Sequence, residues 1–187
     1  MSDSTQSTDE KLAKATVGER KEHNSTIELA EYDASWPLRY REIEVLVRDV
    51  LGDQVVLIEH VGSTSVPGLA AKPIIDIVLE VPDSEQEIEY VPSLENKGFL
   101  LRIREPDWYK HRLLKLNDAN LHVFSAECTE TIRMMRFRNW LRSHPHERDL
   151  YQAKKRELVA RIWKHTQNYA DAKTDVVETI ISRALVN

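Results

Sequence analysis

Residues able to bind phosphate gather in one stretch of the chain, which reads IEHVGSTSVPGLAAKPIIDIVLEV from Ile58 to Val81. A glycine at the end of a strand lets a polyanion approach the backbone amides, and hydroxyl and ammonium groups donate further hydrogen bonds. The stretch supplies one such glycine, three hydroxyl side chains and a cation, at Gly62, Ser63, Thr64, Ser65 and Lys72. It therefore predicts either a phosphate-binding loop or an ordinary tight connection between two strands.

Two familiar motifs built on glycine and serine do not fit this loop. The nucleotide-binding P-loop requires G-x-x-x-x-G-K-[ST], but Gly68 is followed by Leu69 and Ala70. The nucleophile elbow of hydrolases requires G-x-S-x-G, which the sequence GSTSV does not supply. Any phosphate site here must therefore be of another kind.

Asp76 lies inside the otherwise apolar run PIIDIVLEV. Burying a carboxylate is costly unless it is paired, hydrogen-bonded or bound to a cation. Because side chains alternate along a strand, Asp76 shares one face with Val78 and Glu80, while Ile77 points to the other. Asp76 is thus a candidate catalytic and metal-binding residue, or else a carboxylate that hydrogen-bonds the amides of the Gly62 to Ser65 loop.

Four further residues are candidate accessory groups around Asp76. Glu59 is the second carboxylate to examine, and since His60 points the opposite way, at most one of the two faces Asp76. His122 occupies a later strand, and Arg112 could contact an anion or lie along the surface.

The register of the hairpin that carries His122 decides which side chains are its neighbours. If residues 117–120 form the loop and Leu116 faces Leu121, then Lys115 faces His122. His111 then lies roughly 13 Å away along the strand and is not a ligand partner.

Hydrophobic periodicity indicates the elements that must position these residues. A helix is predicted from Trp36 to Leu51, ending at Gly52, and strands at residues 54–61, 72–81, 99–104, 108–116 and 121–126. Helical spacing then continues through residues 129–143, 147–165 and 171–185. The predicted fold class is α+β, a mixed β-sheet flanked by helices with a helical C-terminal third.

Composition limits the classes of protein to consider. The chain has 187 residues and is 41% hydrophobic, so we expect one folded domain at residues 24–187. Its net charge of −5 disfavours nucleic-acid binding. Residues 1–23 have the polar composition of a disordered or weakly helical tail. The sequence has no membrane segment and no signal peptide, which predicts no membrane partner and a cytoplasmic location.

Charge is distributed unevenly, because residues 133–164 hold ten Lys or Arg against three Asp or Glu. This pattern is typical of solvated helix faces, and it also fits a surface for an anionic partner.

The segment EHVGSTSVPGLAAKPIID resembles the signature of the GrpB family, whose members resemble the nucleotidyltransferase superfamily in fold. The segments YDASWP, HRLLKL, NLHVF and FRNWLRSHP are also similar to family blocks, and the resemblance covers about residues 27–186. It implies a nucleotidyltransferase-like sheet in which Gly62 and Ser63 hold nucleotide phosphates. Enzymes of that fold place D-x-D or E-x-E on the next strand, and here Asp76 is followed two residues later by Val78.

The resemblance implies a transferase with an incomplete set of carboxylates, acting on a nucleotide or another small phosphorylated molecule. Asp76 would hold one Mg²⁺ as cofactor, since a pair of Mg²⁺ ions needs several shared carboxylate oxygens. Two alternatives stay open. One is a catalytically inactive nucleotide- or coenzyme-A-related binding or accessory module, and the other is a protein-interaction domain that uses the basic helices.

Overall fold

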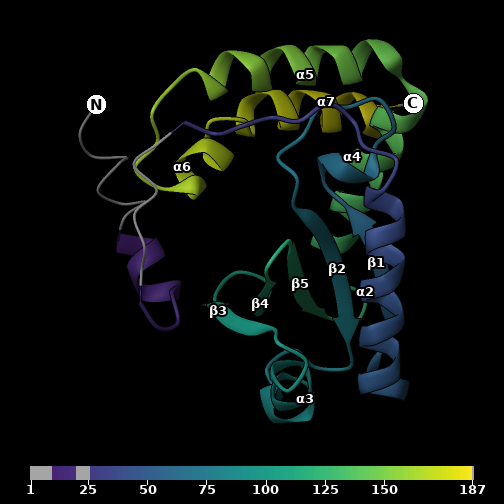
Figure 1. The fold of residues 1–187 in the computed structure, drawn as a ribbon, viewed down its shortest axis with the longest axis vertical. Helices are drawn as coiled ribbons and strands as arrows, with labels where there is room; N and C mark the ends of the chain where they lie inside the picture. Colours follow the sequence, from purple (N-terminus) through teal and green to yellow (C-terminus); the bar gives the residue numbers. More distant parts are fainter. Residues whose placement is uncertain (1–9, 20–25, 187) are drawn as a thin grey trace.

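The computed structural model describes residues 10–19 and 26–186 and contains a five-stranded mixed sheet at its centre (Figure 1). The strand order is β1-β2-β5-β4-β3. The strands are β1 (Leu57–Val61), β2 (Ile75–Val81), β3 (Leu100–Glu105), β4 (His111–Leu116) and β5 (Ala119–Ser125). β2 and β5 run parallel, whereas each other neighbouring pair is antiparallel.

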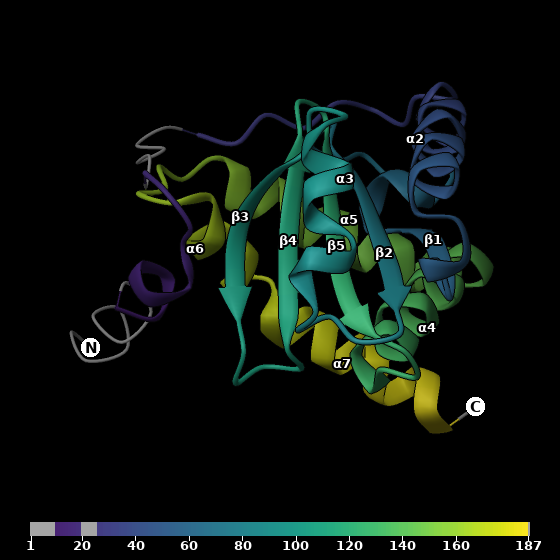
Figure 2. The same ribbon diagram turned by 90° about the horizontal axis from the view of Figure 1, so that it is seen from below.

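Helices lie on both sides of this sheet. They are α2 (Trp36–Leu51), α3 (Val91–Glu95), α4 (Thr129–Ser143), α5 (Pro145–Val159), α6 (Thr166–Asp171) and α7 (Thr174–Val186). Short 3-10 turns occupy Gly52–Gln54, Ser63–Ser65 and Glu87–Glu89. Figure 2 shows α3 in front of the sheet and α5 and α7 behind it. The predicted α+β class, with a mixed sheet and a helical C-terminal third, is confirmed.

The main hydrophobic core lies between the sheet and the α2–α3 layer. Ile77 and Leu79 of β2 are fully buried there, as is Val47 of α2. Pro37 in the first turn of α2 and Gly52 after its last residue are the start and stop signals expected from the sequence. This face of the sheet is apolar along most of its length.

The opposite face of the sheet is covered only in part. At the β1 end, Val61, Val78 and Phe124 are buried against Met134 and Met135 of α4. α5 and α7 pack on α4 and on the loop after β1 through a second cluster that includes Val66, Leu69, Leu141, Tyr151 and Ile180. This face carries both apolar and polar side chains, and Asp76 is among the latter.

The predicted register of the β4–β5 hairpin is wrong. Leu116 pairs with Ala119, so the loop is only Asn117 and Asp118, and residues 119 and 120 belong to β5. Arg39 of α2 holds Asp118 by two hydrogen bonds of 2.7 and 2.9 Å, which fixes the short turn. Because the strands pair two residues closer to the turn than predicted, every side chain on β4 has a different partner.

The bounds of several other elements differ from the predicted ones. Between β2 and β3, residues 84–98 contain one 3-10 turn and the short α3. The helix predicted at 147–165 begins at Pro145 and ends at Val159, and the helix predicted at 171–185 is α7, which begins at Thr174. The short helix α6 was not predicted. The strand predicted from Trp108 begins only at His111.

The N-terminal region is described in part. Residues 10–15 are helical, and Thr16 forms an isolated bridge with Ile103 of β3. Most of the tail predicted for residues 1–23 lies outside the described residues, as do residues 20–25, so the domain boundary stays a prediction. Among the described helices, none has the length and hydrophobicity needed to cross a lipid bilayer.

Candidate functional site

The sheet register places Asp76 in a polar row that crosses three strands. Asp76 pairs with Asn120 of β5, and Asn120 pairs in turn with Lys115 of β4. On its other side Asp76 pairs with Val61, the last residue of β1. Gly62 follows directly, so the Gly-Ser loop begins beside the Asp76 carboxylate, as the sequence indicated.

Gly62 and Asp76 are in direct contact. A Cβ atom placed on Gly62 would lie 2.5 Å from Oδ2 of Asp76 and 2.9 Å from its Cβ, which no real side chain tolerates. The φ angle of Gly62 is +68°, a conformation that favours glycine. Glycine is therefore required at this position for two reasons: the positive φ angle of the turn and the close approach of the Asp76 carboxylate.

The Asp76 carboxylate has polar partners on the neighbouring strand. Nδ2 of Asn120 donates a 2.8 Å hydrogen bond to Oδ1, and Nε2 of His122 lies 3.9 Å from the same oxygen. Burial acts to raise the pKa of Asp76, but His122, Asn120 and the charge of Lys173 outweigh it and hold that pKa below its usual value. Asp76 is consequently ionised at neutral pH in surroundings that favour negative charge.

Two of the three predicted loop hydroxyls support the loop itself. Oγ of Ser65 donates a 2.6 Å hydrogen bond to the carbonyl of Gly62, and Oγ1 of Thr64 donates to the carbonyl of Ile74 at 3.2 Å. Both residues are buried. Ser63 is less buried and opens the 3-10 turn, where the first amides have no partner within the turn. Ser63 is therefore the hydroxyl best placed for a ligand.

Sequence reasoning missed Lys155, which lies on α5 and contacts the Gly-Ser loop. Its Nζ donates a hydrogen bond to Oγ of Ser63 at 3.1 Å and another to the carbonyl of Ala70. Burial lowers the pKa of Lys155 to about 7, and the charge of Lys173 acts in the same direction. The only sequence signal was an inward position on an amphipathic helix, which does not show which loop the side chain reaches.

Other basic and polar residues of α4 and α5 fasten the same loop by its carbonyls and amides. Arg138 donates to the carbonyl of His60 at 2.7 Å, and Arg142 donates two hydrogen bonds to that of Ser65 at 2.8 and 2.9 Å. Oε1 of Gln152 accepts from the amide of Ala70 at 2.8 Å. Part of the positive charge counted at residues 133–164 is thus directed at the protein's own loop.

The remaining predicted residues divide between the two faces of the sheet. Glu59 lies on the Asp76 face, opposite Val78, but its carboxylate pairs with Nη1 of Arg138 at 2.6 Å. His60 lies on the α2 face, where its ring stacks on Tyr40 with centroids 5.0 Å apart. Burial and the charge of Arg142 lower the pKa of His60 to about 4, so His60 is neutral.

Arg112 and Lys72, both predicted as anion contacts, have different surroundings. Arg112 is buried and pairs with Glu87, away from the Asp76 row. Lys72 lies in the loop before β2, close enough to Lys115 for the two charges to repel each other. Lys72 therefore keeps its predicted place near the site, whereas Arg112 does not.

The residues around Asp76 do not fit a pair of magnesium ions. Within the described part of the chain, no group of three or more His, Cys, Asp or Glu side chains could hold a metal ion. Glu80, on the same face, accepts hydrogen bonds from the amides of Glu127 and Cys128 at 3.1 and 3.2 Å. With Glu59 bound to Arg138, Asp76 is the one carboxylate left to the site among these candidates.

The corrected hairpin register brings two histidines together. Nε2 of His111 lies 3.1 Å from Nδ1 of His122, and the two rings stack with centroids 5.2 Å apart. Nδ1 of His111 lies 2.7 Å from Oε2 of Glu105 on β3. A line of polar groups therefore runs from Asp76 through His122 and His111 to Glu105, whereas the predicted register separates the two histidines.

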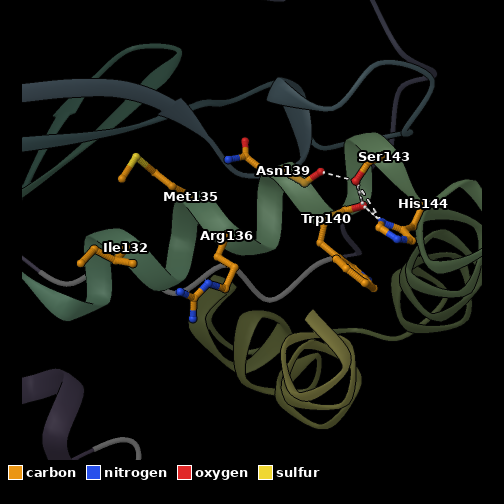
Figure 3. Close-up of a pocket in the computed structure, with 7 residues that line it drawn as sticks. All are labelled: Ile132, Met135, Arg136, Asn139, Trp140, Ser143 and His144. Atoms are coloured by element: carbon orange, nitrogen blue, oxygen red, sulfur yellow. Dashed lines mark hydrogen bonds between the residues drawn. The ribbon is translucent and has the colours of Figure 1, made fainter. Parts of the chain in front are cut away.

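A separate hollow of about 410 Å³ lies on the outer side of α4 (Figure 3). Ile132, Met135 and Trp140 contribute its apolar wall, and the Trp140 ring stacks on His144 just beyond the helix. None of the predicted site residues lines it. We therefore place the candidate site at the Gly-Ser loop and Asp76.

Comparisons with known proteins identify the family. A family model described as GrpB protein matches residues 26–183. A UPF0157 protein of Halalkalibacterium halodurans is 53% identical over 185 residues, which cover 98% of this chain and 95% of that protein. A UPF0157 protein of Streptomyces coelicolor is 42% identical over 160 residues, 84% of each chain.

A solved structure agrees with this assignment. The crystal structure of the conserved protein GrpB from Enterococcus faecalis aligns with a TM-score of 0.70 and 27% identity, covering 84% of this chain and 97% of that one. A cytoplasmic RNA terminal U-transferase aligns with a TM-score of only 0.39 and 10% identity, too little to support an argument. Since the family model spans most of the sequence and close relatives span nearly all of it, the chain belongs to the GrpB family.

Proposed function

We propose that the Gly62–Asp76 site binds the phosphate groups of a nucleotide or another small phosphorylated molecule, as the binding step of a nucleotidyl transfer. The observation that carries this proposal is the contact between Lys155 and Ser63. A buried ammonium group on the first hydroxyl of a Gly-Ser turn is a phosphate-binding arrangement, because it offers a cation and a hydroxyl beside open backbone amides.

The charges near Asp76 support an anionic ligand. Lys173 and Lys155 approach from the helical layer, and the charge of Lys173 acts both on Asp76 and on Lys155. Lys115 lies in the same row of the sheet, and Lys72 lies near Lys115. Several cations around one carboxylate leave the site with excess positive charge, which a phosphate group would neutralise. These side chains offset phosphate charge without a second metal ion.

A single Mg²⁺ on Asp76 stays a prediction from the sequence. Oδ1 of Asp76 already accepts from Asn120, and His122 faces the same oxygen. A hard cation would have to displace the Asn120 amide or bind through waters, as Mg²⁺ commonly does. The metal-dependence of nucleotide binding therefore tests this prediction directly. A cytoplasmic location likewise stays a prediction.

The second candidate function is a binding module without turnover. It is favoured by the carboxylate count: Val78 is a core residue, and Glu59 and Glu80 have other partners. Such a module would bind a nucleotide or a coenzyme-A-related molecule and regulate or present it. The third alternative, a protein-interaction domain that uses the basic helices, is weakened because Arg138, Arg142 and Lys155 point to the Gly-Ser loop.

Calorimetric titration with nucleoside triphosphates, coenzyme A and pyrophosphate, with and without Mg²⁺, tests the proposal. We expect wild type to bind at least one of them, and the Ser63→Ala variant to lose about tenfold in affinity, the effect of one charge-assisted hydrogen bond. Ser182→Ala is the matched control, since that exposed serine lies on α7 and bonds only within its helix. No binding of any phosphorylated compound by wild type would remove both candidate functions.

Product analysis then separates the enzyme from the module. The charge-neutral Asp76→Asn variant should still bind pyrophosphate but lose turnover if the protein is a transferase. If wild type binds nucleotides and forms no product with any hydroxyl acceptor, the binding module is the correct description.

A further inference from the structure

His111 lies at the centre of a hydrogen-bonded line that ends at Asp76. Its Nδ1 is 2.7 Å from Oε2 of Glu105, and its Nε2 is 3.1 Å from Nδ1 of His122. Nε2 of His122 in turn lies 3.9 Å from Oδ1 of Asp76. His111 is only 3% exposed, whereas the side chain of His122 is 23% exposed, so a ligand can reach His122 but hardly His111.

The direction of each hydrogen bond follows from the chemistry of the groups. An ionised carboxylate only accepts hydrogen bonds, so Nδ1 of His111 must carry a proton that it donates to Glu105. Burial lowers the pKa of His111 to about 4, which keeps the ring neutral at neutral pH. Nε2 of His111 is then unprotonated and can only accept, and its partner is Nδ1 of His122.

We propose that Glu105 and His111 fix His122 in its Nδ1–H form, so that Nε2 of His122 is the nitrogen that exchanges a proton with a ligand bound beside Asp76. Glu105 and His111 are positioning residues, and His122 is the group that touches the ligand. In this arrangement Nδ1 of His122 carries a proton in both the neutral and the charged ring, and the two forms differ only in whether Nε2 is protonated. The exchange with a ligand rests on the proposed function, but the tautomer does not.

In a nucleotidyl transfer this arrangement supplies a general base. The hydroxyl oxygen of an acceptor bonds to the α-phosphorus of a nucleoside triphosphate, while the bond to the departing pyrophosphate breaks and pyrophosphate takes that electron pair. Nε2 of His122 accepts the hydroxyl proton, and Asp76 stabilises the imidazolium that forms. The role resembles that of a histidine oriented by a carboxylate in other transferases and hydrolases. Here two residues, Glu105 and His111, orient the histidine together.

Charged or titratable groups of each neighbouring element lie along the line that contains His122 or on the strands and helix beside it. Asp76 lies on β2, His111 and Lys115 on β4, and Glu105 on β3. Glu130 of α4 is buried near His122, and its pairing with Arg133 limits its effect. None of these groups accepts the Nδ1 proton in place of His111, because the ring stacking holds Nδ1 against Nε2 of His111.

Long-range proton–nitrogen correlation spectra of ¹⁵N-histidine-labelled protein identify the tautomer directly, with His122→Gln used to assign the signals. At pH 8 we expect His122 to show a protonated Nδ1 and an unprotonated Nε2. Glu105→Gln should produce a mixture of both forms, because the introduced side-chain amide could donate to His111 as well as accept from it. Glu105 is partly exposed, so this substitution should leave the fold intact.

Glu89→Gln is the matched control, since Glu89 is exposed and lies outside this line. An Nε2–H form of His122 in wild type, or an unchanged tautomer in Glu105→Gln, would overturn the proposal.

Titration with a nucleoside triphosphate separates this inference from the proposed function. We expect the Nε2 signal of His122 to shift more than its Nδ1 signal as the ligand binds. If calorimetry shows binding while the His122 signals stay unchanged, the proposed function survives and the ligand role of His122 fails. If no phosphorylated compound binds, the proposed function and the ligand role of His122 both fail, and only the donation from His122 through His111 to Glu105 stands.

Discussion

The two faces of the sheet are built from the same strands but differ in the contacts that their side chains make. On β2, Ile77 and Leu79 point to the α2–α3 layer and are fully buried among apolar side chains. The alternate residues Asp76 and Glu80 point to the α4 side, where each has hydrogen-bond partners. The α2 side is stabilised mainly by apolar packing, and the α4 side also by specific polar contacts whose partners come from distant parts of the chain.

Polar residues do not cover the α4 side uniformly. Val78 lies between Asp76 and Glu80 on this face, yet it is fully buried with Val61 and Phe124 against α4. On β2 the site therefore occupies only the end near Gly62, and the middle of this strand belongs to the core. Four substitutions test this division, in order of the effect expected.

Val78→Asp recreates the D-x-D spacing of nucleotidyltransferases and should unfold the protein rather than create a metal site. An uncompensated charge in this apolar cluster should reduce the free energy of unfolding by about 3–5 kcal/mol. Urea denaturation with and without Mg²⁺ measures the effect. A folded Val78→Asp variant that Mg²⁺ stabilises would show that position 78 belongs to the site, and Val78→Thr serves as the uncharged control.

Gly62→Ala should cost about 2 kcal/mol or more, because a Cβ is strained at φ +68° and clashes with Asp76. The double variant with Asp76→Ala should recover about 1 kcal/mol of this loss, since the 2.5 Å contact to Oδ2 disappears. The four unfolding free energies of this cycle measure the coupling. Additive effects would mean that the clash is relieved elsewhere and that Gly62 matters only for its backbone angle.

Lys155→Met should change how stability depends on pH. The pKa of Lys155 is about 7 in the folded protein, well below that of an exposed lysine, so between pH 7 and about 10 the unfolded chain binds more protons. Wild-type stability should therefore rise with pH in this range, by up to about 1.4 kcal/mol per unit from this group, and the variant should lack that rise. Lys154→Met, at an outward position on the same helix, is the control.

Asp76→Asn should produce the smallest effect, a change in how strongly stability depends on pH in the acid range. Because the pKa of Asp76 is held below its usual value, its contribution to stability is present above about pH 4 and is lost as pH falls through the folded value. Wild type should lose more stability than the variant between pH 5 and pH 3 in urea titrations. An equal loss in both proteins, with Asp53→Asn as the exposed control, would mean that Asp76 is not held by its partners.

Local patterns predicted the elements of the apolar face and the position of the Gly-Ser loop. The helix from Trp36 to Leu51 and the strand ending at Val61 follow from spacing, capping and stop signals. Alternation along β2 also placed Asp76 on the correct face. These features depend on neighbours in sequence, which a single sequence displays.

Contacts across long separations could not be predicted in the same way. The hairpin register depends on whether the turn has two or four residues, and Arg39 of α2 holds the two-residue form through Asp118. Lys155 reaches Ser63 because α5 packs on the loop, a fact of tertiary geometry. The contact between His111 and His122 was missed because the predicted register was wrong. Nothing in the sequence around Lys155 indicates its contact with Ser63.

The attachment of the Gly-Ser loop to α4 and α5 has a consequence for the order of assembly. Ser63 and Lys155 are separated by 92 positions, and Arg142 lies 77 positions from Ser65. During synthesis at about 5–20 residues per second, the loop therefore leaves the ribosome several seconds before the groups that shape it. The strands can pair before then, but ligand recognition must wait for the C-terminal helices, so binding competence is acquired late in the life of a nascent chain.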